Sequence, residues 1–332
     1  MKKTSTMLAA AVTLLISQAA IATDAPSLDP KLEQDFVAQQ QKLGFNKQQS
    51  QQFVEQAHYN QAVIDAITTP WEAKPWYQYY PIFLTEKRLQ AGLKFWHENQ
   101  QAISDAAKKY QVDPQIIVAI IGIETFYGQY FGNYPVKDAL YTLGFYYPAR
   151  ADFFRKEFGH LQKLIVEEQL DVNTLKGSYA GAMGYGQFIP SSYLAYAVDG
   201  DGDGRRDLIG SKNDAIASVA NYFHQHGWQQ GAPVALPLTA KAGADIADKL
   251  WDHKPLKWQV SDILGSNLAL TDKNALNPKQ PAMLIELEQA SHREYWLGLK
   301  NFYVITRYNR SPLYAMAVYQ FSQELKAAHA AQ

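Results

Sequence analysis

The chain has 332 residues, 47% of them hydrophobic, and no cysteine, while 31 Lys and Arg face 32 Asp and Glu for a formal net charge of -1. This length allows one large domain or two to three smaller ones, and the hydrophobic fraction argues against disorder. The absence of cysteine excludes a disulfide scaffold, a Cys zinc site, a Cys nucleophile and a lipid-modified N-terminal Cys. The balanced charge argues against a general nucleic-acid binder, which needs a basic excess to displace counterions.

Residues 1–22 have the pattern of a cleavable signal peptide. Lys2 and Lys3 form a positive n-region, Met7 to Ile16 form an apolar stretch too short to span a membrane, and Ala20-Ile21-Ala22 is a small-x-small cleavage site. An uncleaved signal-anchor helix is the alternative, and the polar residues that follow the apolar stretch disfavour it. We therefore expect an exported bacterial protein that is soluble after cleavage and has no stable membrane anchor.

Two regions differ in hydrophobic period. From Asp29 to about Ala107, apolar residues recur at helical spacing in Gln-rich surroundings, which predicts helices. From Gly231 onward, short pieces are alternating or rich in β-formers, and helical spacing returns only near Tyr314. The pieces expected to be strands are Val234–Leu238, Leu256–Val260, Ala282–Leu287 and Glu294–Leu297.

An almost wholly apolar helix is predicted after Asp113-Pro114. Asp accepts hydrogen bonds from free N–H groups at a helix start, and proline fits the first helical position. The run Ile116–Ile123 holds no ionisable residue, and Glu124 follows it on the same helix face as Ile120. Burial raises the pKa of a carboxyl group, so Glu124 should keep its proton near neutral pH and serve as a general acid. A buried Glu satisfied by an Arg or a backbone donor is the alternative.

Glycines surround this helix and fill a second unusual stretch. Gly122 and Gly128 are costly in a helix, by about 1 kcal/mol each relative to Ala, and close approach of another backbone or of a ligand is one explanation for them. Gly177–Tyr193 combines glycines with aromatics and a Gln, and it lacks both the GxxxxGK[ST] and the GxGxxG phosphate patterns. We interpret it as the wall of a sugar groove, where small residues let a polymer approach. Dense helix packing and a purely structural turn are the alternatives.

An acidic loop begins at Asp199. Carboxylates at loop positions 1, 3, 5 and 9, glycine at position 6 and a backbone carbonyl at position 7 match the EF-hand pattern for calcium. Position 12, usually a Glu, is Gly210, and an Asp at the start of the next helix could supply the missing carboxylate. We expect a structural Ca²⁺ with no part in the chemistry, and a solvated acidic turn is the alternative. The candidate ligands are Asp199, Asp201, Asp203, the carbonyl of Arg205, Asp207 and Asp214.

Signatures of several other chemistries are absent from the sequence. It holds no HExxH zinc motif, no GxSxG elbow and no nicotinamide fingerprint. His224 and His226 form only an HxH pair at a predicted helix end, where surface residues are the better interpretation. Glycan chemistry is therefore the main enzymatic hypothesis.

Long strings of the sequence carry a resemblance to a known family. They are IETFYG around Glu124, SYAGAMGYGQFIPSSY from Ser178 to Tyr193, the acidic loop after it, and ITRYNRSPLYAMAV from Ile305 to Val318. In order and over most of the chain, they resemble the MltB-type lytic murein transglycosylases of glycoside hydrolase family 103. The resemblance implies a mainly α (α+β) fold with a goose-type lysozyme-like helical core, a helical α domain and a small β-containing domain.

The resemblance and the patterns together predict four segments. We expect a signal peptide over 1–22; a helical α domain over 26–105, completed by 315–332; a lysozyme-like catalytic core with the EF-hand-like loop over 106–230, completed by 301–314; and a small β-containing domain over 231–300.

The resemblance also implies the site residues. It places the catalytic acid at Glu124. Ala149 precedes Arg150, so a neighbouring basic contact of the family is missing, and Tyr77 and Tyr80 compete with Tyr79 for one aromatic position. The implied substrate-binding residues are Tyr79, Arg150, Ser178, Gln187, Tyr222, Tyr308, Asn309 and Tyr314.

The implied activity is cleavage of the β-1,4 bond between MurNAc and GlcNAc of periplasmic peptidoglycan, with formation of 1,6-anhydroMurNAc ends. Glu124 would act first as acid and then as base, and no cofactor is required for the chemistry. No second carboxylate accompanies Glu124 in the glycine-containing motifs, which favours substrate-assisted chemistry over a two-carboxylate hydrolase. The alternatives are a noncatalytic peptidoglycan-binding protein and a lysozyme-type muramidase. Glycan strands are the expected partner of a monomer that has no lipobox, and cell-wall synthases or amidases are further candidate partners.

Overall fold

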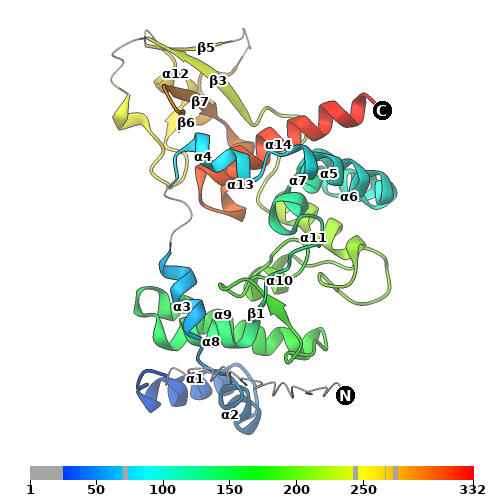
Figure 1. Cartoon of the computed structure of the whole chain (residues 1–332), viewed down its shortest axis with the longest axis vertical. Coiled ribbons are helices and arrows are strands. Elements are labelled where there is room, and N and C mark those ends of the chain that lie inside the picture. Colours follow the sequence, from blue (N-terminus) through cyan, green and yellow to red (C-terminus); the bar gives the residue numbers. More distant parts are fainter. Residues whose placement is uncertain (1–24, 70–73, 242–245, 266, 272–275) are drawn as a thin grey trace, which may run out of the picture.

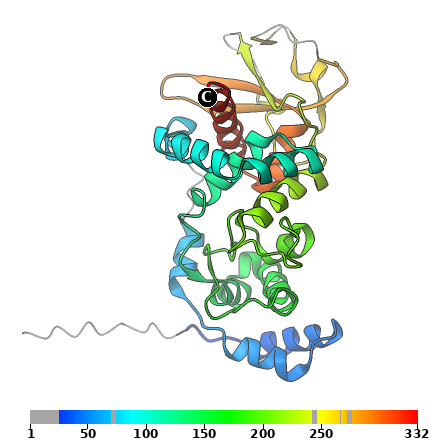
Figure 2. The same cartoon turned by 90° about the vertical axis from the view of Figure 1, so that its right-hand side faces the viewer.

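The computed structural model describes residues 25–69, 74–241, 246–265, 267–271 and 276–332, and the predicted signal peptide lies outside these ranges. The described part is mainly helical with a small antiparallel sheet, as predicted (Figure 1). The molecule is elongated, with that sheet at one end and the first helices at the other (Figure 1, Figure 2). None of the described helices is long and apolar enough to cross a membrane.

The end of the molecule that carries the first helices is a bundle with an aromatic core. Phe158 packs against Phe36 and Phe53, with ring centroids 5.1 and 4.5 Å apart. Each of the first three helices begins after an Asp or Asn whose side chain accepts a backbone N–H of the first turn. The bundle consists of α1 (Pro30–Lys42), α2 (Lys47–Glu55), α3 (Gln61–Thr68), α8 (Val136–Tyr146) and α9 (Ala151–Glu167).

A second bundle surrounds α7 (Pro114–Thr125), which is buried along nearly its whole length, as its apolar sequence predicts. The helices that pack directly on it are α5 (Glu86–Glu98), α6 (Gln100–Tyr110), α11 (Lys212–Gln225) and α14 (Pro312–Ala330). The contacts therefore divide the segment 26–105 between two bundles, because α1 to α3 pack toward α8 and α9 while α5 and α6 pack on α7.

The remaining short elements lie between or beside the helices of the two bundles, or within the segment that carries the sheet. A two-residue pairing joins two loops, and short helices flank the bundles. These elements are α4 (Trp76–Tyr79), η2 (Tyr80–Ile82), β1 (Tyr134–Pro135), η3 (Pro148–Arg150), β2 (Lys176–Gly177), α10 (Pro190–Tyr196), η4 (Ala247–Lys249), α12 (Val260–Ile263) and α13 (Lys300–Tyr308).

The sheet lies within the segment 231–300 and has its own apolar core. Its antiparallel strand order is β4-β6-β7-β3-β5. All four predicted strand segments overlap a strand, whereas β5 was missed and α13 begins before the expected return of helix. The strands are β3 (Ala235–Ala240), β4 (Trp258–Gln259), β5 (Leu268–Leu270), β6 (Pro281–Glu288) and β7 (Arg293–Gly298).

Asp113 precedes α7 as predicted, but its side chain does not cap that helix. Its carboxylate instead accepts hydrogen bonds from Trp228 Nε1 at 2.9 Å and from the backbone N–H of Gly231 at 3.1 Å. A buried indole N–H needs an acceptor, and the loop after α11 brings this one close enough to compete with the helix start. Asp113 therefore joins the start of α7 to the loop that leads into the sheet.

The Asp113→Asn variant should be less stable, because an amide offers a weaker acceptor and turns a donor toward Trp228 or Gly231. We expect the free energy of unfolding to fall by about 1–3 kcal/mol, as measured by urea denaturation. Asp105→Asn is the matched control, because Asp105 is exposed on α6 and, among the described residues, accepts side-chain hydrogen bonds from Gln101 of the same helix. Equal losses in the two variants would contradict the role given to Asp113.

Candidate active site

Glu124 lies in the last turn of α7 with its side chain partly exposed, while the residues on either side of it are buried. Burial raises the pKa of the Glu124 carboxyl to about 7, and a hydrogen bond from Tyr314 partly opposes that rise. The Tyr314 hydroxyl donates this bond to Glu124 Oε1 at 2.5 Å. At neutral pH both forms of the carboxyl are populated, so Glu124 can give up a proton and take one back.

Tyr308 lies close to this pair, and Tyr222 packs against Tyr308. Tyr308, on α13, donates to the carbonyl of Gly186 at 2.5 Å, and Tyr222, on α11, donates to the carbonyl of Arg307 at 2.6 Å. Their rings meet edge to face with centroids 4.7 Å apart. Burial raises the pKa of Tyr308 well above its ordinary value, and the charge of Glu124 adds to the rise, so the hydroxyl stays protonated.

The predicted stacking role suits these tyrosines unequally. Tyr222 and Tyr314 are only 6% and 4% exposed, so their ring faces are covered by protein. Tyr308 is partly exposed and keeps some ring surface open. The structure therefore brings Tyr314 and Tyr308 to Glu124 and places Tyr222 against Tyr308. The rings of Tyr222 and Tyr314 are covered by protein, and their hydroxyls donate to the Arg307 carbonyl and the Glu124 carboxyl.

The glycine-rich segment Gly177–Tyr193 packs closely against other parts of the protein, and protein atoms occupy the space beside several of its glycines. A Cβ on Gly184 would lie 2.3 Å from the carbonyl oxygen of Leu208, and one on Gly186 would lie 2.8 Å from Tyr308 Oη. Gly177 and Gly181 are equally crowded, by the carbonyl of Ala182 and by Leu140. Close packing of protein atoms, and not the approach of a polymer, accounts for these glycines.

Ser178 and Gln187 both sit in tight turns of this segment. Ser178 Oγ accepts from the backbone N–H groups of Ala180 at 3.3 Å and Ala182 at 3.1 Å. Gln187 has a left-handed backbone with φ 50°, and its Nε2 donates to the carbonyls of Phe131 at 3.2 Å and Gly184 at 3.1 Å. The hydroxyl hydrogen of Ser178 and the amide oxygen of Gln187 are the polar groups that these bonds leave over.

Thr125, which the sequence reasoning did not single out, joins the segment to the end of α7. Its Oγ1 donates to the carbonyl of Tyr185 at 3.0 Å and accepts from the N–H of Gly128 at 3.1 Å. Gly128 is a glycine because a Cβ there would lie 2.3 Å from the Tyr185 ring. The one sequence signal was a polar, β-branched residue next to the acid in an otherwise apolar run.

The remaining predicted contacts differ in their distance from the acid. Asn309 Oδ1 accepts from Ser311 N at 3.0 Å at the start of α14, one turn before Tyr314. Tyr79 is 6% exposed and close enough to Tyr314 to raise the pKa of that hydroxyl. Arg150 lies in η3 with its guanidinium 4.4 Å from the Phe153 ring centroid, and no interaction found among the described residues joins it to Glu124.

The acidic loop brings some of its predicted ligands together. Carboxylate oxygens of Asp199, Asp201 and Asp203 lie within 4.8 Å of one another, which suits a hard cation. Asp207 lies outside this group, and its Oδ1 accepts from the N–H of Gly210 at 2.8 Å. The N–H of Arg205 donates to Asp203 Oδ1 at 2.8 Å, inside the same turn.

Asp214 is buried at the start of α11 and already has two partners. Its oxygens accept from the N–H groups of Gly200 at 2.7 Å and Asp207 at 2.6 Å. Burial raises the pKa of its carboxyl, and the charges of Asp201 and Asp199 add to the rise. Asp214 therefore holds the two ends of the loop, and a cation nearby would relieve the repulsion that it feels.

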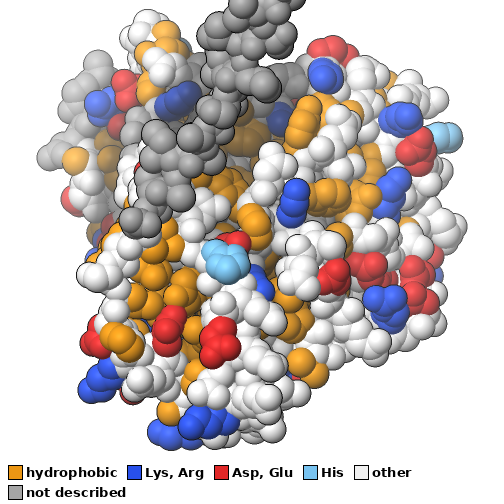
Figure 3. Space-filling model, turned by 60° about the horizontal axis from the view of Figure 1, so that its bottom comes forward, with side chains coloured by type: hydrophobic (Ala, Val, Ile, Leu, Met, Phe, Trp, Pro, Cys, Tyr) orange, Lys and Arg blue, Asp and Glu red, His pale blue; other side chains and the backbone are white. Residues whose placement is uncertain are grey.

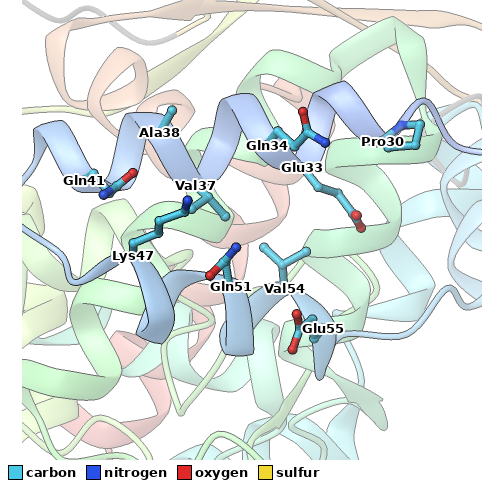
Figure 4. A pocket seen from close by; sticks show the side chains of 10 residues that line it. All are labelled: Pro30, Glu33, Gln34, Val37, Ala38, Gln41, Lys47, Gln51, Val54 and Glu55. Carbon is cyan, nitrogen blue, oxygen red and sulfur yellow. The ribbon is translucent and has the colours of Figure 1, made fainter.

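A pocket between α1 and α2 lies apart from the predicted site residues. Its lining combines Glu33, Lys47 and Glu55 with three glutamines and four apolar side chains, and none of its residues is a predicted site residue (Figure 4). On the face at this end of the molecule, acidic and basic side chains are interspersed with hydrophobic ones (Figure 3). The charged side chains that are visible on this face are therefore of both signs.

The Tyr314→Phe variant should raise the pKa of Glu124 further, because it removes the bond that opposes the effect of burial. We expect a rise of about 1 unit, equivalent to about 1.4 kcal/mol, in a carbon-detected NMR titration of the Glu124 carboxyl. Tyr319→Phe is the control, since Tyr319 lies on the same helix and donates instead to the carbonyl of Ala235. An unchanged or lowered pKa in Tyr314→Phe would refute the assigned hydrogen bond.

Comparison with known proteins identifies the family. Residues 29–323 match the family model described as "Transglycosylase SLT domain". The chain is 40% identical over 310 residues to membrane-bound lytic murein transglycosylase B of Escherichia coli, covering 90% of this chain and 84% of that protein. Soluble lytic transglycosylase SltB1 of Pseudomonas aeruginosa is 41% identical, with a TM-score of 0.83 over 91% of this chain and 100% of that one. The E. coli lytic transglycosylase SLT35, solved in complex with calcium, is 40% identical, with a TM-score of 0.80 over 90% and 94% of the two chains. The chain therefore belongs to the transglycosylase SLT family, and is an enzyme of the lytic murein transglycosylase group.

Proposed function

We propose that this enzyme cleaves the β-1,4 bond between MurNAc and GlcNAc of peptidoglycan and leaves 1,6-anhydroMurNAc ends, with Glu124 as the acid and base. The observation that carries the proposal is the pKa of about 7 for the Glu124 carboxyl, which accepts a hydrogen bond from Tyr314. Within the described part of the chain, no Asp or Glu contributes to that pKa. A single carboxyl that can change its protonation state is what a transfer within the substrate needs, whereas ordinary glycoside hydrolysis uses two.

In the first step, Glu124 gives its proton to the glycosidic oxygen, the bond from C1 of MurNAc to that oxygen breaks, and GlcNAc leaves with a new hydroxyl. The MurNAc 2-acetamido group stabilises the electron-poor C1. In the second step, the Glu124 carboxylate takes the proton of the MurNAc C6 hydroxyl, and O6 attacks C1 to close the anhydro ring. The proton lost in the first step is regained in the second, and no water is consumed.

Three polar side chains have groups left over for the sugar. The Ser178 hydroxyl accepts backbone bonds, so its hydrogen is available to the acetamido oxygen. Gln187 keeps its amide oxygen as an acceptor, and Asn309 keeps its NH₂ as a donor. We assign Tyr308 to contact with the sugar, and Tyr79 and Arg150 to outer parts of the groove.

We further propose export to the periplasm by the N-terminal signal peptide, with release as a soluble form, because the sequence has no cysteine to carry a lipid. We assign the loop trio Asp199, Asp201 and Asp203 to a structural Ca²⁺, which is supported by their mutual distances and by the calcium in a 40% identical relative.

The Glu124→Gln variant should fold and bind glycan strands yet release no anhydro-muropeptides from purified sacculi. An amide cannot transfer the proton, so we expect turnover to fall by about 10²-fold or more. Mass spectrometry of the soluble products measures this loss. Wild-type products should be lighter by one water than hydrolysed ones. Products with reducing ends would show a muramidase instead, and substantial lysis by Glu124→Gln would remove Glu124 from the mechanism.

Calcium should raise the Tm of the enzyme without changing turnover, because a ligand that binds only the folded loop stabilises by mass action, by about 2.7 kcal/mol at a hundred times its Kd. The comparison is between EDTA-treated and calcium-loaded protein in calorimetry and in the sacculus assay. Asp201→Asn combined with Asp203→Asn should abolish the shift in Tm. A wild-type Tm that is the same with and without calcium would contradict the assignment, and so would a turnover that requires calcium.

A further inference from the structure

The chain turns sharply just after Glu124. Phe126, Tyr127 and Gly128 follow one another with positive φ angles of 50°, 61° and 86°. Residues with a side chain rarely adopt this left-handed conformation, and it persists only where surrounding contacts enforce it. Within the turn, the N–H of Tyr127 reaches back to the carbonyl of Ile121 at 3.3 Å. The end of α7 therefore depends on an anchor for these side chains.

Tyr127 is anchored in a slot between two helices. A Cβ on Gly92 of α5 would lie 2.3 Å from Tyr127 Oη, and a Cβ on Gly122 of α7 would lie 2.4 Å from the same atom. The Tyr127 ring stacks on Phe95 of α5, with centroids 5.1 Å apart. Only a pair of glycines leaves room for this hydroxyl, so the slot and the side chain fit each other.

The fit of Tyr127 is steric. Its hydroxyl is buried and has no hydrogen-bond partner within the residues that the structure describes. Burial also raises the pKa of this hydroxyl, and the nearby charge of Arg88 only partly offsets the rise. An unpaired polar atom is unfavourable in such a place, so what the side chain contributes is its shape and reach.

The neighbouring residue of the turn is held by the same helix. The Phe126 ring faces the guanidinium of Arg88 at 5.0 Å and the ammonium of Lys87 at 5.6 Å. Arg88 is fixed in its turn, because its Nη1 donates to the carbonyl of Ile82 at 2.8 Å. The side chains of Phe126 and Tyr127, the two non-glycine residues with a left-handed backbone after Glu124, therefore both pack on α5, which carries no predicted site residue.

We infer that Tyr127 is a positioning residue for Glu124: its insertion between Gly92 and Gly122 enforces the left-handed turn and sets where the Glu124 carboxyl meets Tyr314. The inference rests on the proposed role of Glu124 as acid and base. Tyr127 needs no contact with substrate, because it acts through the backbone that follows the acid. A displacement of about 1 Å in a catalytic group costs on the order of a hundredfold in rate, so the anchor has a kinetic effect.

The test is the Gly92→Ala substitution, which places a methyl group in the slot from the side of α5. Gly92→Ala drives a Cβ into Tyr127 Oη, while the other close atom is the flexible end of Leu325. We expect kcat on sacculi to fall about tenfold or more with little change in KM. The alkaline limb of the kcat profile should move to higher pH, because a displaced Tyr314 bond no longer opposes the effect of burial on Glu124.

The rescue is specific to one atom. Adding Tyr127→Phe to Gly92→Ala removes the colliding oxygen and should restore kcat and the pH profile to those of Tyr127→Phe alone. The same addition should not rescue Gly122→Ala, because a Cβ there also lies 2.6 Å from the Tyr127 Cζ. Gly159→Ala on α9 is the control, since its Cβ would crowd only the Gln40 side chain, at 2.6 Å, and should leave kcat unchanged.

A folded Gly92→Ala with wild-type kcat and pH profile would overturn the inference, and so would a loss that Tyr127→Phe does not relieve. If Gly92→Ala does not fold, Tyr127→Leu replaces it, because the shorter apolar side chain leaves the slot empty and gives up no hydrogen bond. Reduced kcat at unchanged KM in Tyr127→Leu supports the inference, and unchanged kcat overturns it. Activity retained by Glu124→Gln would contradict the proposed function instead.

Discussion

The interaction on which the site depends is the hydrogen bond between Tyr314 and a carboxyl group placed in an apolar helix. Burial alone would favour the neutral acid, and the bond from Tyr314 favours the charged base. Their balance gives Glu124 a pKa of about 7, the range in which one group serves both steps of a transfer. Among the helices packed on α7, α14 supplies Tyr314, so its position bears directly on this balance.

The partners of Glu124 come from distant parts of the chain. Tyr314 lies 190 residues after it in sequence. It arrives because the sheet returns the chain into α13, and because Asn309 and Ser311 then form the turn that starts α14. Tyr319 on the same helix donates to the carbonyl of Ala235 in β3, so the sheet also braces α14. The β-containing segment thus contributes to the site without a residue in it, by setting the position of α14.

What the sequence could predict was chemistry that a local pattern expresses. Glu124 was evident as the one acid that ends an apolar helix, and four strand segments followed from alternation. β5, at three residues, is too short to show a period, and the early residues of α13 follow directly from β7. Asp113 was correctly placed before α7 but wrongly given a capping bond, because its actual partner, Trp228, is brought close only by the fold.

The glycines show the same limit more generally. Their number near Glu124 was a true signal of close approach, yet sequence alone could not say what approaches. The structure gives a separate answer for each: Tyr127 at Gly122, Tyr185 at Gly128, and Tyr308 at Gly186. At these three positions a tyrosine fills the space, whereas backbone carbonyls crowd Gly177 and Gly184 and Leu140 crowds Gly181.

The acidic loop follows a related logic, in which backbone groups account for a departure from the expected pattern. Asp199 accepts hydrogen bonds from the N–H groups of Gly202 and Gly204, and Asp214 accepts them from those of Gly200 and Asp207. These four bonds close the loop from both ends. In the EF-hand pattern a Glu at loop position 12 binds the ion through both oxygens. Gly210 stands there instead, and the buried carboxylate of Asp214 on α11 binds two backbone N–H groups of the loop. A cation would then meet a backbone already folded around it, and its main contribution would be to offset the repulsion among the carboxylates.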